Sequence, residues 1–456
     1  MRAFIASSIG VACAAAAVLP LTVPGGLAGS ASAAPAPASE SVAAPRLPGS
    51  TQSLPLVPLT PPPTTTPPGS SDSVSLGLPA REVEPFSLLG VVWDDPEEEP
   101  HGRIQVRTKS TATGEWSSWQ DLETHADRPD PDSAESRGDE VRGATAPLWV
   151  GDSNGVQARV LPEEGASGAH RLPEGLRLDL VHPGDDPPAG AGGEDPAGEA
   201  NSALAPAGAL EIPALDRRET GEDLLAVRAP GRTGQADQGE QTEQAERSGQ
   251  SEAGAEAPIG PRPGIVTRKG WGADERLRGA FLYTRTVKVA FVHHTAMSND
   301  YACGQSAAII RGIYRYHVQS NGWRDVGYNF FVDKCGRIYE GRAGGVANPV
   351  MGAHTYGFNH DSTGIAVLGS YNSTNPSTAA VNAVSKLVAW KLGLHGVDPR
   401  GTAAMTSGGG KYPKGTMVGL RTVSGHRDGY VTGCPGDRLY SRLGTIRATA
   451  ARLQGR

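Results

Sequence analysis

The distribution of aromatic residues divides this chain before any motif is considered. Of its 25 Phe, Trp and Tyr residues, 19 lie at or beyond Arg262, six lie before Gly151 and none lies between. Aromatic side chains supply much of the apolar surface that a globular core buries. One core therefore cannot run through all 456 residues, and we expect two folded regions joined by a poorly packing stretch.

The first 33 residues predict export. Arg2 precedes an apolar run from Ile5 to Val23, and an Ala-Ser-Ala cleavage signal occupies positions 31–33, which is the pattern of a secretory signal peptide. A membrane anchor and a lipobox at Cys13 are the alternatives. Prolines and glycines interrupt the run before a spanning length, and Gly10 stands where a lipobox has leucine. We expect a secreted, wall-associated protein whose mature chain has no transmembrane segment.

The mature chain would keep three cysteines, which are Cys303, Cys335 and Cys434. An odd number in an exported protein allows one disulfide and leaves a thiol for other chemistry.

Composition sets the remaining boundaries. Residues 34–74 are rich in Pro, Ser and Thr and predict a disordered leader. Short alternating strands over 75–183 predict an all-β accessory domain, drawn as a small sandwich. Its Trp116 and Trp119 either stack on sugars or belong to the core. Residues 184–261 are acidic and predict a disordered linker.

Residues 262–456 mix strands and helices and predict an α/β domain. The segment "TVKVAFVHHT" alternates apolar residues as a buried strand does, and it carries His293 and His294 at its C-terminal end. The segment "QSAAIIRGIYRYHV" has helical spacing, and "STAAVNAVSKLVAWKLGLHG" predicts a capped amphipathic helix. "TGIAVLG" predicts a further strand.

Two histidines and one cysteine suggest zinc chemistry. A catalytic zinc takes three protein ligands and keeps a fourth position open. His293 at a strand end, with His426 and Cys434 eight residues apart in a glycine-rich loop, would supply two nitrogens and a sulfur. A histidine at a strand end is more often a core residue, so each signal alone is weak.

Four blocks in order, "FVHHTA", "GWRDVGYNFFVDKCGRIYEGR", "GAHTYGFNHDSTGIAVLG" and "SGHRDGYVTGCPG", resemble peptidoglycan recognition proteins and the related zinc-dependent N-acetylmuramoyl-L-alanine amidases of phage type. The resemblance begins near Pro263 and runs to the C-terminus. It implies a central mixed β-sheet flanked by helices, with Zn²⁺ bound on one face.

The resemblance also implies roles for individual residues. His293, His426 and Cys434 match the metal ligands, and Tyr328 and Thr432 match the catalytic positions that stabilise the developing oxyanion. A disulfide between Cys303 and Cys335 is implied as well. The positions that touch the muramyl group and the stem peptide in relatives are His317, Gly322, Trp323, His354 and Asn359.

Two of these substrate positions have plainer interpretations. His317 has the spacing of a residue that packs a helix, and "NGW" can be a turn followed by a buried tryptophan. In the family, a Gly-Trp pair at this place goes with diaminopimelate in the stem peptide, whereas Asn-Phe goes with lysine. Gly322 and Trp323 therefore predict a preference for diaminopimelate-type peptidoglycan.

We accordingly expect an exported, monomeric zinc amidase that cleaves the bond between N-acetylmuramic acid and L-alanine. From Arg262 onward the net charge is +15, against −22 upstream, which suits contact with anionic wall polymers. Nucleic acid is not expected, since an exported chain rarely meets it. A non-catalytic peptidoglycan-binding module and a zinc endopeptidase are the rivals, although the H-E-x-x-H motif of common zinc proteases is absent.

Overall fold

A computed structural model describes residues 49–59, 76–124, 127–136, 140–162, 172–185, 195–228 and 258–456. The expected signal peptide, residues 1–33, lies outside these ranges. Among the described residues, no helix combines the length and apolar content needed to cross a membrane.

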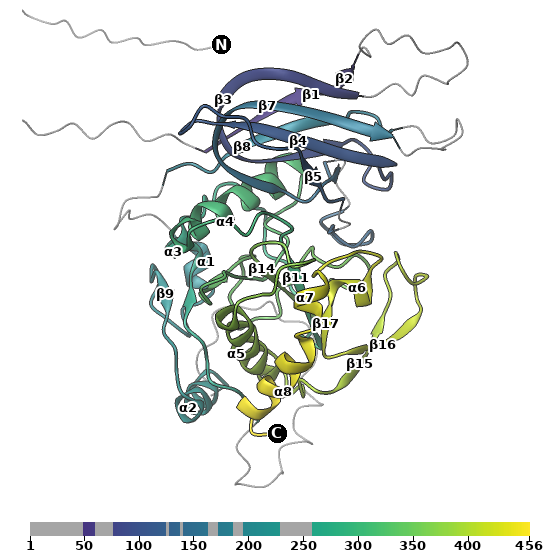
Figure 1. Ribbon diagram of the computed structural model, residues 1–456. Helices are drawn as coiled ribbons and strands as arrows, with labels where there is room; N and C mark the ends of the chain where they lie inside the picture. The colour runs from purple at the N-terminus through teal and green to yellow at the C-terminus, as the bar shows by residue number, and fades with distance from the viewer. Residues whose placement is uncertain are drawn as a thin grey trace, which may run out of the picture. The chain divides into compact units, whose positions relative to one another are not determined.

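The N-terminal domain is an all-β domain, as predicted. Its described strands form one antiparallel network in the order β1-β8-β3-β7-β4-β5, and β2 and β6 also pair with β3 (Figure 1). The strands are hydrogen-bonded into one network, because the long, bulged β3 pairs with β2, β6, β7 and β8. The bounds are β1 Ser50–Pro55, β2 Val57–Pro58, β3 Leu76–Trp93, β4 Gly102–Ser110, β5 Gln120–Leu122, β6 Gly143–Ala144, β7 Leu148–Pro162 and β8 Arg177–His182.

The expected leader, residues 34–74, contains the first strand of this domain. β1 pairs with β8 in register from Ser50 opposite His182 to Pro55 opposite Arg177. Proline is tolerated in a strand at the edge of a sheet, where its missing N–H breaks no ladder. The predicted boundary at residue 75 was therefore too late.

The C-terminal domain has a mixed sheet in the order β17-β11-β14-β12-β13-β10-β9. β11 lies between two parallel neighbours, β14 and β17, and all six of its residues are buried, which suits its nearly continuous apolar sequence. The bounds are β9 Glu211–Ile212, β10 Ile265–Val266, β11 Val289–His294, β12 Phe330–Val332, β13 Ile338–Glu340, β14 Ser362–Val367 and β17 Val423–Gly425. β15 Thr402–Thr406 and β16 Met417–Arg421 form a separate hairpin.

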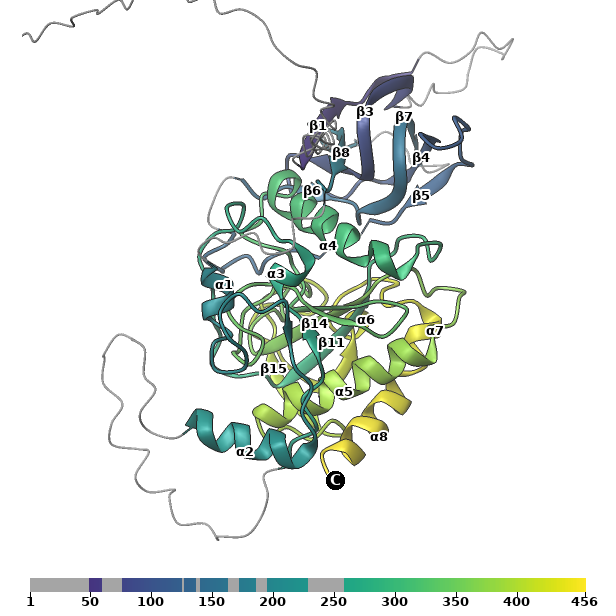
Figure 2. The same cartoon turned by 90° about the vertical axis from the view of Figure 1, so that its left-hand side faces the viewer.

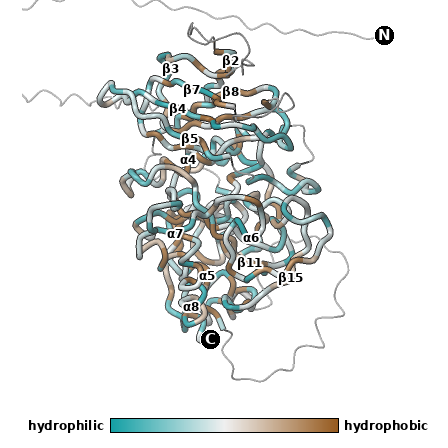
Figure 3. Tube along the Cα trace, turned by 45° about the vertical axis from the view of Figure 1, so that its right-hand side comes forward, coloured by the Kyte–Doolittle hydropathy of each residue, from teal (hydrophilic) through white to brown (hydrophobic). Residues whose placement is uncertain are grey.

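Helices cover this sheet. α5 (Thr378–Leu394) begins after Ser377, whose side chain accepts the N–H of Ala380, and α5 packs beside α8 (Leu443–Leu453) (Figure 2). Apolar residues of both helices join the sheet in one buried core, and α5 is coloured mainly as hydrophobic in Figure 3. α4 (Ser306–Arg315) contributes to another core cluster together with Phe331 and Ala366 of the sheet. These elements confirm the predicted mixed α/β domain.

The other described helices are mostly short. They are α1 Pro196–Glu199, α2 Arg217–Arg228, α3 Arg268–Trp271, η1 Cys303–Gln305, η2 Tyr316–Ser320, α6 His426–Gly429 and α7 Asp437–Tyr440.

Part of the expected linker, residues 184–261, is folded. β9 extends the mixed sheet by pairing with β10, and Asn201 donates to both carboxylate oxygens of Glu340 at 2.9 and 3.0 Å. Arg262 binds Asp223 at 2.8 Å. The prediction of disorder was wrong for residues 195–228, because strand pairing and buried polar contacts replace the missing aromatic core.

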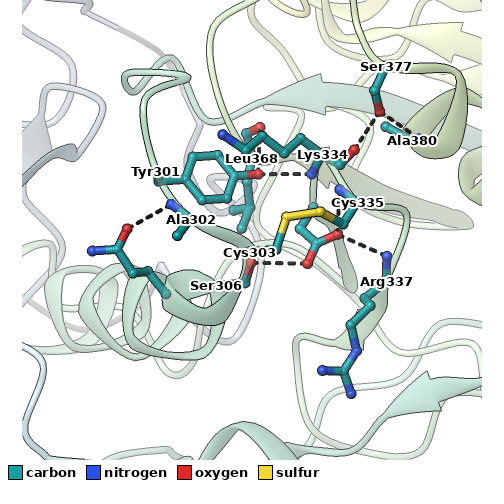
Figure 4. The surroundings of a disulfide bond; sticks show 12 residues. Tyr301, Ala302, Cys303, Ser306, Lys334, Cys335, Arg337, Leu368, Ser377 and Ala380 are labelled. Atoms are coloured by element: carbon teal, nitrogen blue, oxygen red, sulfur yellow. Dashed lines mark hydrogen bonds between the residues drawn. A yellow bond between two sulfur atoms is a disulfide. The ribbon is translucent and has the colours of Figure 1, made fainter.

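A disulfide joins Cys303 to Cys335, with their Cα atoms 6.3 Å apart. Figure 4 shows the bridge near Ser306 and Arg337. Asp333 Oδ1 accepts the Cys335 N–H at 3.0 Å, and its Oδ2 accepts the Ser306 hydroxyl at 3.0 Å. The bridge therefore connects the start of α4 to the turn between β12 and β13.

Candidate metal centre

Two parallel strands bring a pair of histidines together. Val292 of β11 pairs with Gly425 of β17, so the residues that follow, His293 and His426, lie at the same edge of the sheet. Their ring centroids are 4.5 Å apart and both side chains are fully buried.

Cys434 completes the group. Its sulfur lies 3.8 Å from Nδ1 of His293 and accepts the backbone N–H of His294 at 3.4 Å. Within the described residues, the metal-binding atoms of His293, His426 and Cys434 all lie within 4.8 Å of one another.

This donor set fits zinc. Zinc–sulfur and zinc–nitrogen bonds of about 2.3 and 2.0–2.1 Å separate tetrahedral S and N ligands by about 3.6 Å, close to the observed 3.8 Å between Cys434 and His293. Burial, followed by the charge of Asp127, raises the pKa of the Cys434 thiol well above its ordinary value. A bound cation would reverse that shift, because a coordinating thiol is deprotonated.

Thr355 holds the His293 ring. Its Oγ1 lies 3.4 Å from Nε2 of His293, which leaves Nδ1 toward the Cys434 sulfur. Such a partner fixes the tautomer and orientation of a histidine ligand. Nothing in the sequence around Thr355 marks it as a partner of a metal ligand, because a threonine beside His354 has no distinctive motif.

His294 lies apart from the group, as expected. Adjacent residues of a strand point to opposite faces, and Nδ1 of His294 accepts the N–H of Tyr371 at 3.2 Å.

Tyr328 and Asp127 lie against the histidines. The Tyr328 ring centroid is 5.3 Å from that of His293, and its hydroxyl donates to Asp127 Oδ2 at 2.5 Å. Asp127 Oδ1 lies 3.3 Å from Nδ1 of His426 and 3.7 Å from Nδ1 of His293. Burial and the charges of Asp127 and Cys434 raise the pKa of Tyr328. Asp127 follows β5 in the N-terminal domain, and its sequence context, an ordinary acidic loop, gave no sign of this position.

The predicted substrate residues gather around Tyr328 and the histidines. His317 stacks near Trp323 with ring centroids 4.4 Å apart, and its Nδ1 accepts the N–H of Gly327 at 3.1 Å. Burial, and then the charge of Arg342, lowers the pKa of His317 to about 3. Gly322 has φ of +73°, and a Cβ there would lie 1.9 Å from the carbonyl oxygen of Glu140.

His354 and Asn359 lie next to the metal residues. The His354 ring centroid is 5.2 Å from that of His293, and burial, with the charge of Arg342, lowers the pKa of His354 to about 3. Asn359 Oδ1 accepts the backbone N–H of His354 at 2.7 Å. Thr432 accepts the N–H of Cys434 at 3.2 Å, whereas the Cys303–Cys335 disulfide belongs to the α4 region.

Sequence comparison places this geometry in a known family. Over 183 residues the chain is 30% identical to peptidoglycan-recognition protein SC2 of Drosophila simulans, and the match spans 85% of that protein and 40% of this chain. The chain belongs to the peptidoglycan recognition protein family. Within that family, the human N-acetylmuramoyl-L-alanine amidase is 32% identical over 187 residues, which are 40% of this chain and 28% of the human protein.

Two family models match separate parts of the chain. Residues 283–437 match the N-acetylmuramoyl-L-alanine amidase model, and residues 41–178 match the "Rv3811 N-terminal galactose-binding domain-like" model. Among solved family members, Drosophila PGRP-LB is 26% identical and aligns with 40% of this chain and 92% of its own, with a TM-score of 0.32.

Proposed function

We propose that this peptidoglycan recognition protein is a zinc-dependent N-acetylmuramoyl-L-alanine amidase that hydrolyses the amide between N-acetylmuramic acid and L-alanine. The observation that carries the proposal is the set of His293, His426 and Cys434, whose ligand atoms lie within 4.8 Å of one another beside Tyr328. When bound, zinc would polarise the amide carbonyl and lower the pKa of a water molecule.

The protein's own groups would stabilise the charge that develops on the carbonyl oxygen. The raised pKa of Tyr328 keeps its hydroxyl protonated at neutral pH, so that it can donate a hydrogen bond to an oxyanion. The Thr432 hydroxyl accepts the Cys434 N–H at 3.2 Å, and a hydroxyl that accepts still has a proton to donate. Thr355 would keep the His293 ring in place throughout.

Substrate recognition is proposed for the neighbouring residues. His317 and His354 are neutral at ordinary pH because their pKa values are lowered to about 3, so they would contact the muramyl group as uncharged donors or acceptors. Gly322 and Trp323 predict preference for a diaminopimelate stem. Gly322 has φ of +73°, so a residue with a side chain would be strained there, and Trp323→Phe alone is the cleaner test. This variant should bring the cleavage rates of diaminopimelate-type and lysine-type muropeptides closer together.

Export by residues 1–33, association with the wall through the net charge of +15 and a monomeric state remain part of the proposal. Binding of peptidoglycan without hydrolysis is the alternative. The complete His-His-Cys set argues against it, because a module that only binds peptidoglycan has no need of the three-ligand set that a catalytic zinc uses.

Mass spectrometry of muropeptides treated with the full chain and zinc tests the proposal. An amidase releases peptides with a new free L-alanine amine. Cys434→Ala should lose both stoichiometric zinc and this product, whereas His182→Asn in β8 should keep both. Full hydrolysis by Cys434→Ala would refute the assignment. Substrate that stays intact when bound to the parent chain and to an Asp127→Asn variant would favour the alternative.

A further inference from the structure

A short acidic segment of the N-terminal domain contacts the metal centre. It comprises residues 127–136 between β5 and β6, here termed the β5–β6 loop, with four acidic residues and one arginine. Both domains belong to the same compact unit, Arg46–Arg456. Asp127, Asp130 and Glu135 each bond to residues of the C-terminal domain.

Asp127 lies at the distance of a fourth metal ligand. Tetrahedral nitrogen and oxygen ligands with bonds of about 2.0–2.2 Å are separated by about 3.4 Å. Asp127 Oδ1 lies 3.3 and 3.7 Å from the Nδ1 atoms of His426 and His293. Its other oxygen accepts the Tyr328 hydroxyl at 2.5 Å, so one carboxylate engages both the metal residues and the proposed oxyanion donor.

Asp130 binds Gly357 and Asn359, which lie beside the metal residues. Its Oδ1 accepts the backbone N–H of Gly357 at 2.7 Å and the side-chain N–H of Asn359 at 2.9 Å. Asn359 also donates to the backbone carbonyl of Arg128 at 2.9 Å. The amide that we assign to substrate contact is therefore engaged by the loop.

Glu135 anchors the far end of the loop. It forms two bonds to the Arg342 guanidinium, at 2.7 and 2.8 Å, and accepts the N–H of Arg324 at 3.0 Å. Both side chains are nearly inaccessible, with 4% of Arg342 and 1% of Glu135 exposed. A bidentate, buried pair of this kind holds its geometry far better than a surface ion pair.

The loop leaves little room for a substrate. The three metal-site residues, Tyr328 and Trp323 each expose 4% or less of their surface. The cavity lined by Asp127 and Trp323 measures about 160 Å³, below the roughly 300–1,000 Å³ of ordinary ligand sites. A muropeptide with a sugar and several amino acids does not fit.

We propose that Asp127 is a fourth protein ligand of the metal and that the β5–β6 loop is a built-in inhibitor of the amidase. This inference rests on the proposed function. With the loop in place the metal has no open position and the substrate residues are covered; hydrolysis requires the loop to leave, taking Asp127, Asp130 and Glu135 with it.

The test compares the full-length parent with Asp127→Asn, which keeps the side-chain size and an acceptor for Tyr328. Asp132→Asn is the matched control: Asp132 lies in the same loop, but its ion pair with Lys414 is 64% exposed on both sides, and a surface pair of this kind contributes little to holding the loop. Zinc affinity is measured by competition with a chromophoric chelator, the visible spectrum of the cobalt-substituted protein reports the coordination number, and hydrolysis is measured at saturating zinc.

We expect Asp127→Asn to bind zinc at least about tenfold more weakly, as loss of a ligand or its close partner does, to show a changed cobalt spectrum and to hydrolyse muropeptides faster. Asp132→Asn should match the parent. Unchanged zinc affinity would show that Asp127 is no ligand, and slower hydrolysis would make it a catalytic group rather than an inhibitor. If parent and variant bind zinc yet neither cleaves, Glu135→Gln is added to Asp127→Asn to weaken the far end of the loop. If that double variant does not cleave either, the amidase function and its inhibition are both wrong, while the affinity difference still identifies the ligand.

Discussion

Thr355 Oγ1 lies 3.4 Å from Nε2 of His293, while Nδ1 of the same ring lies 3.8 Å from the Cys434 sulfur. One ring nitrogen is thus positioned by a hydroxyl and the other is left for a metal ion. Thr355→Val should weaken zinc binding about 10–100-fold, the usual effect of removing a hydrogen-bond partner of a ligand.

A chelator competition titration measures this change. Thr355→Ser keeps the hydroxyl and should stay near the parent affinity. If the valine and serine variants bind zinc equally, the hydroxyl does not orient His293.

The buried His317 predicts acid sensitivity. Its pKa is lowered from 6.5 to about 3, first by burial and then by Arg342. As pH falls below about 6.5 the unfolded chain gains a proton that the folded chain does not take up until about pH 3, so stability falls across this window. Glutamine in His317→Gln can still accept the Gly327 N–H. The melting temperature of this variant should fall less between pH 7 and pH 4.5 than that of the parent protein. Parallel melting curves for the two proteins would contradict this.

Asn201 predicts that the residues before 262 stabilise the C-terminal domain. Its amide donates to Glu340 and its Oδ1 accepts the Val346 N–H at 2.8 Å. Asn201→Ala leaves the Val346 N–H without this acceptor and leaves Glu340 with the Arg268 N–H as a remaining donor. The change should cost about 1–3 kcal/mol of unfolding free energy. Urea denaturation measures the change, and Ser202→Ala, at the exposed neighbouring position, should be neutral. An equal effect of both substitutions would show that the Glu340 contact contributes nothing.

The disulfide predicts a separate contribution to stability. Cys303 and Cys335 close a loop with a sequence separation of 32, which the chain-entropy model values at about 3–4 kcal/mol. Replacing both by serine should lower the free energy of unfolding, measured by urea denaturation, by that amount. Zinc content should not change, because Cys434 is untouched; loss of zinc in the double variant would couple the bridge to the metal centre.

The sequence was most informative where periodicity and motif coincide. Alternating Val287, Val289 and Phe291 predicted a buried strand, and β11 has that strand with His293 near its end. The helices α4 and α5 followed from apolar spacing and from the Ser377 cap. These are local properties, which each segment carries by itself.

The missed features depend on contacts between distant segments. The stretch holding Asn201 has few apolar residues, and its order comes from Glu340 and Val346, which lie more than a hundred positions away. In the sequence, Asp127 is likewise one acidic residue among several. Only the folded structure brings it into contact with Tyr328 and the histidines. Composition averaged over a window cannot register such single partners.

The pairing of β11 with β17 also orders the assembly of the molecule. His426 and Cys434 share one local loop, but His293 joins them only when Val292 has aligned with Gly425 across the sheet. Contacts of such long sequence separation form late, because closing the intervening chain costs entropy that is recovered only afterwards. The metal centre therefore cannot nucleate the domain, and a chain cleaved within the intervening segment and separated into its pieces retains no three-ligand set. Metal binding by this protein thus reports whether β11 and β17 have paired.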